Sequence, residues 1–291
     1  MKKIIFSAIL ATTLLVALSQ CFNKSSKGTE KPKEVKLVTH KEGADTLRRD
    51  TNTPLANLVI RPFKGNESYD FYKNNDISSL FRADYPDNGF YGADRYRIEF
   101  IITEAKRDSF NVNIYHVKGQ NRHKKVITPF EGFIRLLDMA AIEDPNLNKE
   151  ETTEMGMDRI IAASGDFELR EADPTSKYSG VFKGTFKTEF SRYTNQETKA
   201  ITYEPWFYSE NLPTHGAGYR FDGTWTSYTD PTTSKPVIWA KDLFRFGNEI
   251  LKDFSYGERD VQINPIYRNL GWEDVWSGDN EWWKEAVKPQ L

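Results

Sequence analysis

The chain has 291 residues, of which 40 are Lys or Arg and 42 are Asp or Glu, so its formal net charge is −2. This balance lacks the basic excess of nucleic-acid-binding proteins, and we expect no nucleic-acid partner. Cys21 is the single cysteine, which excludes an intramolecular disulfide. Aromatic residues make up 14% of a chain whose mean hydropathy is −0.65. Because aromatic side chains bury large areas, we expect one good core or two small ones.

The first residues have the pattern of an export signal. Lys2 and Lys3 supply positive charge, and residues 4–18 contain no charged side chain and many large aliphatic ones. A helix of about 15 residues spans roughly 22 Å, which is shorter than the ~30 Å hydrocarbon core of a bilayer. We therefore interpret residues 1–20 as a cleavable signal peptide and not as a permanent transmembrane helix.

The sequence Leu18-Ser19-Gln20-Cys21 resembles the lipobox of bacterial lipoproteins. Gln20 departs from the family pattern, which usually has Gly, Ala or Ser there. The resemblance implies that Cys21 carries acyl chains such as palmitate, that a peptidase cuts before it, and that the lipids hold the mature protein in a membrane. Phe22 stands where an Asp would favour inner-membrane retention. The resemblance thus implies the outer membrane, on the periplasmic face, with the cell surface as the alternative.

Composition divides the mature chain into a tether and a body. Residues 21–56 are mostly Lys, Ser, Gly, Pro, Thr and Glu, and such a segment buries too little surface to offset its ordering entropy. We expect a lipid-anchored flexible tether there. Residues 57–291 are expected to form a single β-rich body with a helical, Trp-rich C-terminal segment.

Several segments of the body alternate apolar and polar residues with the period of a half-buried strand. Tyr96–Ile102 and Phe110–Ile114 have this pattern, with a turn expected at Asp108-Ser109 between them and another at Lys118–Asn121. Further strands are expected at residues 126–136, 160–169, 178–190, 200–208, 218–228 and 236–240.

One short pattern occurs three times in the body. An aromatic residue, a charged residue, a glycine, a spacer and a large apolar residue surround Gly132, Gly184 and Gly223. On a strand the aromatic, the glycine and the apolar residue face the same side. A glycine on the inner face allows the sharp bending that small barrels need.

Helical spacing is confined to short segments. Trp239 to Phe254 and Asp279 to Val287 are expected to be helical, and residues 133–141 fit a helix or a strand. The predicted class is therefore mainly β, with an antiparallel barrel-like or strongly curved sheet and two or three short helices, mostly C-terminal. From Arg95 to Ala240 this architecture resembles lipocalin-like and other calycin barrels. The sequence departs from that family because it has no clear Gly-x-Trp signature near the first strand.

The sequence contains no recognised catalytic motif, and we expect neither cofactor nor metal. His116 and His123 could meet across a hairpin, but no third metal ligand is identifiable. Asp166 and Glu168 share a strand face, which is typical of a solvated surface. A carboxylate pair for hydrolysis stays open, so enzymatic activity is left undecided, with binding favoured over catalysis.

Aromatic residues concentrate around a loop near residues 209–218 and near the C-terminus. Such clusters bind small apolar or glycan ligands, or they fill a core. The favoured hypothesis is a non-catalytic binding module for a small apolar or glycan ligand. One alternative is a protein scaffold or envelope-assembly factor that binds an envelope protein through Trp272, Trp276, Trp282 and Trp283, and another is a carboxylate-dependent hydrolase. The candidate ligand-binding residues are Tyr203, Trp206, Tyr208, Tyr219, Phe221 and Trp225.

Overall fold

The computed structural model describes residues 58–144, 147, 149–207, 210–251, 262–273, 275–276 and 281–284. By its contacts the chain divides into Met1–Thr46 and Leu47–Leu291, and every described residue belongs to the second, compact unit. The predicted signal peptide, Cys21 and the whole of the predicted tether lie outside the described residues. Within the described residues, no helix is long and apolar enough to cross a membrane.

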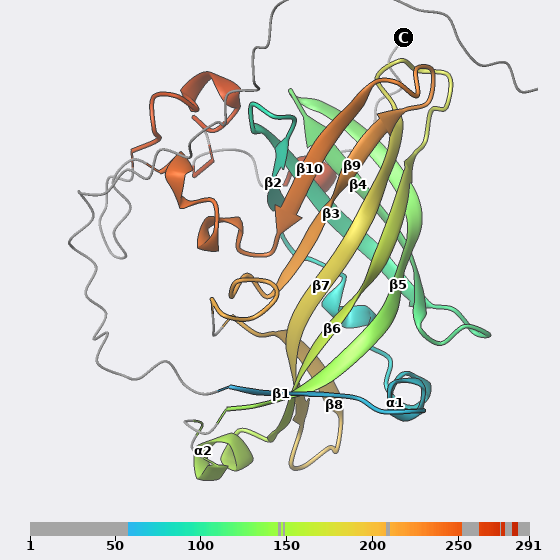
Figure 1. The fold of residues 1–291 in the computed structure, drawn as a ribbon, viewed down its shortest axis with the longest axis vertical. Coiled ribbons are helices and arrows are strands. Elements are labelled where there is room, and N and C mark those ends of the chain that lie inside the picture. The colour runs from blue at the N-terminus through green and yellow to red at the C-terminus, as the bar shows by residue number, and fades with distance from the viewer. Residues whose placement is uncertain are drawn as a thin grey trace, which may run out of the picture. The chain divides into compact units, whose positions relative to one another are not determined.

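One antiparallel sheet of ten strands dominates the structure (Figure 1). The strands are β1 Val59–Pro62, β2 Asp87–Tyr91, β3 Tyr96–Arg107, β4 Ile114–His123, β5 Val126–Glu143, β6 Met157–Glu171, β7 Gly180–Thr194, β8 Ile201–Pro205, β9 Tyr219–Ser227 and β10 Ser234–Ala240. Eight strands close into a ring in the order β2-β3-β4-β5-β6-β7-β9-β10, and β1 and β8 pair with β5 and β7 outside this ring. The predicted mainly β, antiparallel and barrel-like class is confirmed.

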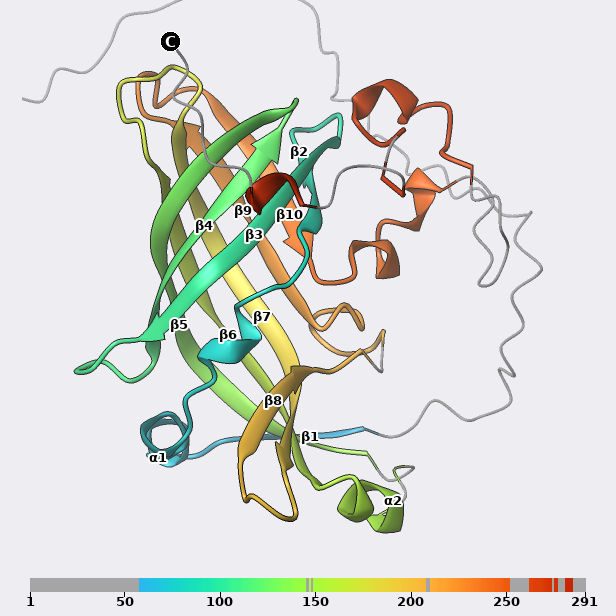
Figure 2. The same cartoon turned by 180° about the vertical axis from the view of Figure 1, so that it is seen from behind.

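The two ends of the ring differ. At one end, which we call the hairpin end, turns join β2 to β3, β4 to β5, β6 to β7 and β9 to β10. At the other, the extension end, β5, β6 and β7 continue beyond the ring. There β1 pairs with residues 140–143 of β5, and β8 pairs with residues 190–194 of β7. The helices α1 (Glu67–Asn74) and α2 (Lys149–Glu154) also lie at the extension end (Figures 1 and 2).

Aromatic rings fill the centre of the barrel. Trp239 is stacked between Phe100 and Phe221, with ring centroids 4.1 and 4.3 Å away. Phe167 meets the edge of the same indole at 5.1 Å. Contacts of this geometry add to the free energy gained by burying each ring. The inward residues of the ring strands complete this core: Ile98, Tyr115, Val117, Phe130, Ile134, Leu136, Phe182, Phe186 and Trp225.

The segment before β2 closes the extension end of the barrel from inside. Phe81, after a single 3-10 turn at Ser78–Leu80, packs 4.9 Å from Tyr115 and 5.5 Å from Phe186. Phe71 of α1 packs 6.3 Å from Phe190 of β7. The sequence did not reveal α1, because its eight residues are mostly polar and only Phe71 and Tyr72 are buried.

The three predicted glycine positions all lie within strands. Gly132 is in β5, and Gly184 of β7 pairs directly with Gly223 of β9. Phe182 and Phe186, on either side of Gly184, are buried in the core. A Cβ added at Gly184 would lie 2.1 Å from the carbonyl oxygen of Asp222, so only glycine permits this approach between strands.

Two local predictions around the β3–β4 connection are wrong. The strand expected at Phe110–Ile114 is wrong. Residues 108–113 form a loop, because Asp108 Oδ1 accepts hydrogen bonds from the backbone N–H groups of Phe110 and Asn111. This side chain competes with strand pairing, and β4 begins only at Ile114. The turn expected at Lys118–Asn121 lies inside β4, and the chain turns at Lys124 and Lys125, both with positive φ.

The predicted helix from Trp239 to Phe254 is also wrong. Trp239 belongs to β10, which pairs with β2 and with β9. The chain after β10 forms two single 3-10 turns, at Leu243–Arg245 and Asn248–Ile250. These turns bury Leu243 and Ile250 in one cluster with Phe90 and Trp272, which explains the apolar residues at helical spacing without a helix. Residues 133–141 are strand, and Phe254 lies outside the described residues. Of the predicted helix Asp279–Val287, only residues 281–284 are described, with a 3-10 turn at Trp282–Lys284.

Candidate functional site

The aromatic residues predicted to bind a ligand are spread along the length of the barrel. Phe221 lies in its centre, Trp225 lies toward the hairpin end, and Tyr203 lies at the extension end, where its hydroxyl donates to Asn75 Oδ1. Tyr203, Tyr219, Phe221 and Trp225 are buried, and Trp206 is partly buried. Tyr208 lies outside the described residues. The buried members pack in the core, and a ligand-binding role for the set stays a prediction.

A buried carboxylate, Glu171, lies beside Trp225. It accepts hydrogen bonds from Trp225 Nε1 at 2.9 Å, Asn121 Nδ2 at 2.8 Å and the Gly180 backbone N–H at 2.7 Å. Burial raises the pKa of Glu171, and these donors oppose the rise. Sequence reasoning missed Glu171, although it continues the inward row of Phe167 and Leu169 at a spacing of two.

Asp87 and Glu189 also carry buried carboxyl groups. Asp87 accepts a hydrogen bond of 2.5 Å from the Tyr219 hydroxyl and lies 3.7 Å from Lys241 Nζ. Burial raises the pKa of Asp87 to about 6, against the opposing charge of Lys241. Glu189 accepts hydrogen bonds from the backbone N–H and the hydroxyl of Thr214, and burial raises its pKa to about 7. Each group thus has donors for its oxygens, as a buried acid requires.

Glu189 fixes the connection between β8 and β9. Its backbone N–H donates to Gly218 and its carbonyl accepts from Trp206, while its carboxylate holds Thr214. Leu212 of this connection is buried in a small apolar cluster with Ile142, Met157 and Ile160, and Trp206 packs against that cluster. The connection therefore covers part of the outer face of the extended strands.

The two histidines of β4 face opposite sides of the sheet. His116 is exposed, with Nε2 2.9 Å from Asp108 Oδ2. His123 faces inward, with its ring centroid 4.5 Å from that of Tyr91 and 5.1 Å from that of Tyr96, and burial lowers its pKa to about 4. His116 and His123 therefore do not share a metal site. Within the described residues, no three His, Cys, Asp or Glu side chains group as metal ligands.

The predicted surface carboxylates Asp166 and Glu168 form ion pairs. Asp166 pairs with Arg135 across β5 and β6 at 2.5 Å. Glu168 lies 2.5 Å from Arg170 and 3.5 Å from Lys183. These pairs lie along the outer face of the sheet and have the arrangement of a solvated face.

The C-terminal tryptophans mostly cover the barrel. Trp272 is buried, and its Nε1 donates to the carbonyl of Arg95 at 2.9 Å. Trp282 is buried with Arg122 5.0 Å above its ring, and its 3-10 turn lies over β3 and β4 (Figure 2). Trp276 is 55% exposed beside Phe244. Of these three, Trp276 is the one that presents its ring to solvent.

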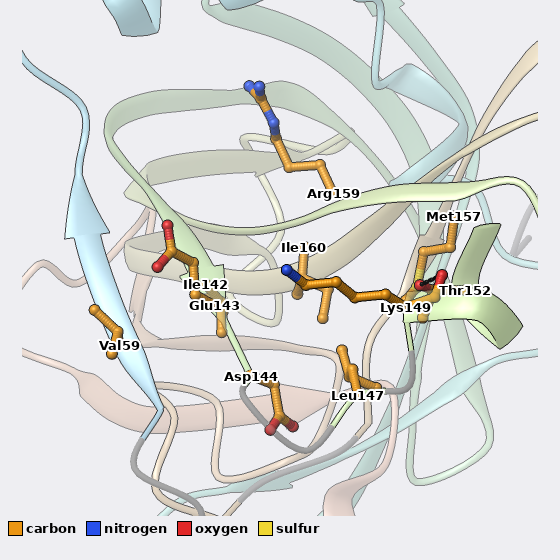
Figure 3. Close-up of a pocket in the computed structure, with 10 residues that line it drawn as sticks. All are labelled: Val59, Ile142, Glu143, Asp144, Leu147, Lys149, Thr152, Met157, Arg159 and Ile160. Atoms are coloured by element: carbon orange, nitrogen blue, oxygen red, sulfur yellow. Dashed lines mark hydrogen bonds between the residues drawn. The ribbon is translucent and has the colours of Figure 1, made fainter.

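A hollow of about 390 Å³ lies at the extension end, where β1, β5, β6 and α2 meet (Figure 3). We call it the corner hollow. Its apolar part is formed by Val59, Ile142, Leu147, Met157 and Ile160. Its polar part is formed by Glu143, Asp144, Lys149, Thr152 and Arg159.

Strand register explains how the corner hollow forms. Ile142 of β5 and Ile160 of β6 are direct partners, although 18 positions separate them in sequence. A register irregularity between Leu136 and Asp138 precedes them, and beyond it Ile142 and Ile160 lie in the outer cluster with Leu212. The outer face of the extended strands thereby gains an apolar floor outside the main core.

Two cations border this floor. Figure 3 shows the Lys149 side chain reaching across the hollow in front of Ile160, and Arg159 extending from its upper edge. Glu143 is paired with Arg61 of β1 at 2.9 Å. In the described part of the chain, the side chains of Lys149 and Arg159 make neither an ion pair nor a hydrogen bond. The hollow thus combines apolar surface with two cations, Lys149 and Arg159, and two carboxylates, of which Glu143 is already paired with Arg61.

A second hollow, of about 680 Å³, adjoins the first. It shares Ile142, Glu143, Arg159 and Ile160 with the corner hollow. Most of its remaining lining comes from β1, from Phe63 just after β1, and from α1 with Phe71. Arg159 therefore borders both hollows.

Comparisons with known proteins give no match: no family model, no curated protein and no solved structure corresponds to this chain. The likeness to lipocalin-like barrels stays an expectation from architecture.

Proposed function

We propose that the protein is a lipid-anchored, non-catalytic binding module of the bacterial cell envelope whose ligand site is the corner hollow. The observation that carries this proposal is the apolar floor bordered by Lys149 and Arg159, which lack ionic partners among the described residues. The ligand class that fits is a small, largely apolar molecule with an acidic group.

The hollow provides both kinds of contact that such a ligand needs. Ligand sites are mostly apolar, with a few polar groups that fix orientation, and they have volumes of roughly 300–1,000 Å³. Ile142, Met157 and Ile160 supply apolar surface, and a carboxylate near Lys149 or Arg159 would form charge-assisted hydrogen bonds. Of the two carboxylates in the lining, Glu143 is paired with Arg61 and Asp144 lies at the lower edge, across the hollow from Arg159 (Figure 3).

The barrel interior is the less suitable place for a ligand. Trp239 and its stacked neighbours Phe100 and Phe221 occupy the centre with ring contacts of 4.1 and 4.3 Å. A ligand there would have to displace close-packed side chains, which costs free energy. The corner hollow needs no such rearrangement.

The lipid anchor in this proposal rests on the sequence. Leu18-Ser19-Gln20-Cys21 follows an uncharged apolar stretch and contains the single cysteine of the chain. Acylation would give that cysteine a purpose in an oxidising compartment, where a lone thiol is reactive.

Titration calorimetry with three eight-carbon probes tests the ligand class. We expect octanoate to bind, octanol to bind more weakly because it lacks the charge, and octylamine to bind least because it meets Lys149 and Arg159. The fluorescence of Trp206, which packs against the floor cluster, should change with octanoate. Equal affinity for all three probes would contradict a cation-bordered site.

Variants of the two cations separate the site from nonspecific binding. Lys149→Ala together with Arg159→Ala should weaken octanoate binding roughly tenfold, which is about 1.4 kcal/mol. Lys183→Ala removes a cation that faces Glu168 on another part of the sheet and serves as the matched control. Loss of binding in the control, or full binding in the double variant, would refute the assignment.

A protein-binding role is a second proposal, and the exposed ring of Trp276 favours it. Trp276 is 55% exposed and Ile266 is 76% exposed in the C-terminal part of the fold. Crosslinking in cells through a photoreactive residue at position 276 should then give one discrete adduct, whereas the same residue at Tyr178 should not. Identical adduct patterns at the two positions would remove this proposal.

A further inference from the structure

Protruding segments at the extension end each expose a large apolar side chain. Phe110, in the loop between β3 and β4, is 91% exposed. Tyr69 of α1 is 55% exposed, and Met155, in the turn between α2 and β6, is 62% exposed. Ile201, at the start of β8, is 42% exposed. Removing such side chains from water against another surface would lower the free energy of the protein.

These segments are far apart in sequence but lie at one end of the fold. The loop that carries Phe110 is tied to β5, because Asn113 and Leu136 exchange hydrogen bonds of 2.8 and 2.9 Å. Arg107, just before this loop, donates to the carbonyl of Tyr72 in α1. β1, α1, α2 and β8 gather at the bottom of both views in Figures 1 and 2.

Both faces of β1 add to the apolar surface at this end. Val59 and Ile60 are 48% and 46% exposed, and all four residues of β1 are exposed. β1 pairs with β5 on one side. The short strand therefore places consecutive aliphatic side chains toward solvent.

The chain also enters the described fold at this end. Leu58 directly precedes β1, and roughly 37 residues separate it from Cys21, a length whose root-mean-square reach as a flexible chain is roughly 30–35 Å. A membrane that held the lipids of Cys21 would thus be within reach of the extension end. This step rests on the lipid anchor of the proposed function.

We propose that the extension end docks on the bilayer that holds the anchor, with Phe110, Tyr69, Met155 and Ile201 entering its interfacial region. Aromatic and aliphatic side chains at the tips of separate loops gain free energy on leaving water for that region. The charges at this end are mixed: Lys64 and Lys73 lie near α1, and α2 is rich in Glu. Docking therefore depends on apolar insertion and only weakly on anionic lipid or on salt.

Vesicle sedimentation of the compact unit Leu47–Leu291 tests the docking without the anchor. We expect it to bind vesicles of phosphatidylcholine and vesicles of phosphatidylethanolamine with phosphatidylglycerol to a similar extent. Phe110→Ser should lower the partition coefficient roughly tenfold. Phe110→Ser combined with Met155→Ser should lower it further. Both side chains are exposed, so both variants should fold, which circular dichroism verifies.

Tyr178→Ser is the matched control, since Tyr178 is 75% exposed but lies in the turn between β6 and β7 at the hairpin end. It should leave binding unchanged. Failure of the wild-type unit to bind either vesicle, or an equal loss in Tyr178→Ser and Phe110→Ser, would overturn the proposal. Mass spectrometry of Cys21 separates this result from the anchor: an acylated Cys21 with no vesicle binding refutes the docking alone, and an unmodified Cys21 with vesicle binding refutes the anchor alone.

Discussion

Gly184 of β7 lies directly opposite Gly223 of β9, and a Cβ added at Gly184 would come within 2.4 Å of the Gly223 Cα. No side chain fits between these two strands. The pair lies in the wall of the barrel, between Phe182 and Phe186 on one strand and Phe221 and Trp225 on the other.

Gly184→Val should therefore destabilise the protein strongly. We expect a loss of about 3 kcal/mol in unfolding free energy, because the added side chain overlaps backbone atoms that cannot move independently. Urea denaturation measures it. Thr185→Val, at the neighbouring exposed position, is the control and should change stability by less than about 0.5 kcal/mol. Equal effects would show that the strands are not in close contact there.

Glu189 should make stability depend on pH near neutrality. Burial raises its pKa from the usual 4.5 to about 7 in the folded protein, so the folded state binds the proton more tightly. The stability it contributes is present below pH 4.5 and is lost as pH rises through 7. Between pH 6 and pH 8 the loss should be about 1.4 kcal/mol.

Glu189→Gln should remove this part of the pH dependence, since glutamine stays neutral. Urea midpoints at pH 6 and pH 8 should then differ less in the variant than in the wild type. Asp87 loses its proton at lower pH, and its smaller contribution is common to both proteins. An unchanged pH dependence in Glu189→Gln would mean that Glu189 does not titrate in this range.

Trp225 should stabilise the fold through its hydrogen bond to Glu171. Trp225→Phe removes the Nε1 donor and leaves the buried carboxylate with two donors. We expect a loss of about 1–3 kcal/mol in unfolding free energy. Octanoate affinity should not change, because Trp225 is not in the corner hollow. Trp276→Phe, at an exposed ring, should affect stability little, and a comparable loss there would argue against the hydrogen-bond explanation.

Cys21 should be the acylated N-terminus of the mature protein. Mass spectrometry of the wild type from bacterial cells should show a chain that begins with a diacylglyceryl-cysteine. Cys21→Ala should accumulate as a longer, unacylated precursor, since the sequence has no second thiol. A mature wild-type chain with any other N-terminus would exclude the lipoprotein assignment.

The sequence predicted the sheet well because the information about it is local. The alternation at Tyr96–Ile102 and the Phe-x-Gly patterns around Gly184 and Gly223 arise from strands with one buried face. Trp239 was assigned correctly to a strand at residues 236–240 and wrongly to a helix that continues to Phe254, because the 3-10 turns after β10 repeat its apolar spacing at three to four residues. The strand predicted at Phe110–Ile114 was wrong because the Asp108 side chain accepts a hydrogen bond from the backbone of the loop. Hydrophobic periodicity gives no information about such a hydrogen bond.

The candidate site was not predictable from the sequence. Ile142 and Ile160 form its floor because β5 and β6 pair in one register, with an irregularity between Leu136 and Asp138 before it. Long-range register is not encoded in any local pattern. The sequence analysis interpreted the aromatic residues around the β8–β9 connection as a ligand site, whereas in the structure Phe221 and Trp225 fill the core of the barrel.

Methyl NMR of the isoleucines tests most directly whether the ligand binds outside the barrel. The side chains of Ile142 and Ile160 line the corner hollow, whereas Ile98 and Ile134 are buried in the core of the ring. During an octanoate titration, the methyl signals of Ile142 and Ile160 should shift together and saturate, while those of Ile98 and Ile134 stay in place. Shifts confined to Ile98 and Ile134 would place the ligand inside the barrel, and no shift at any of the four would contradict binding altogether.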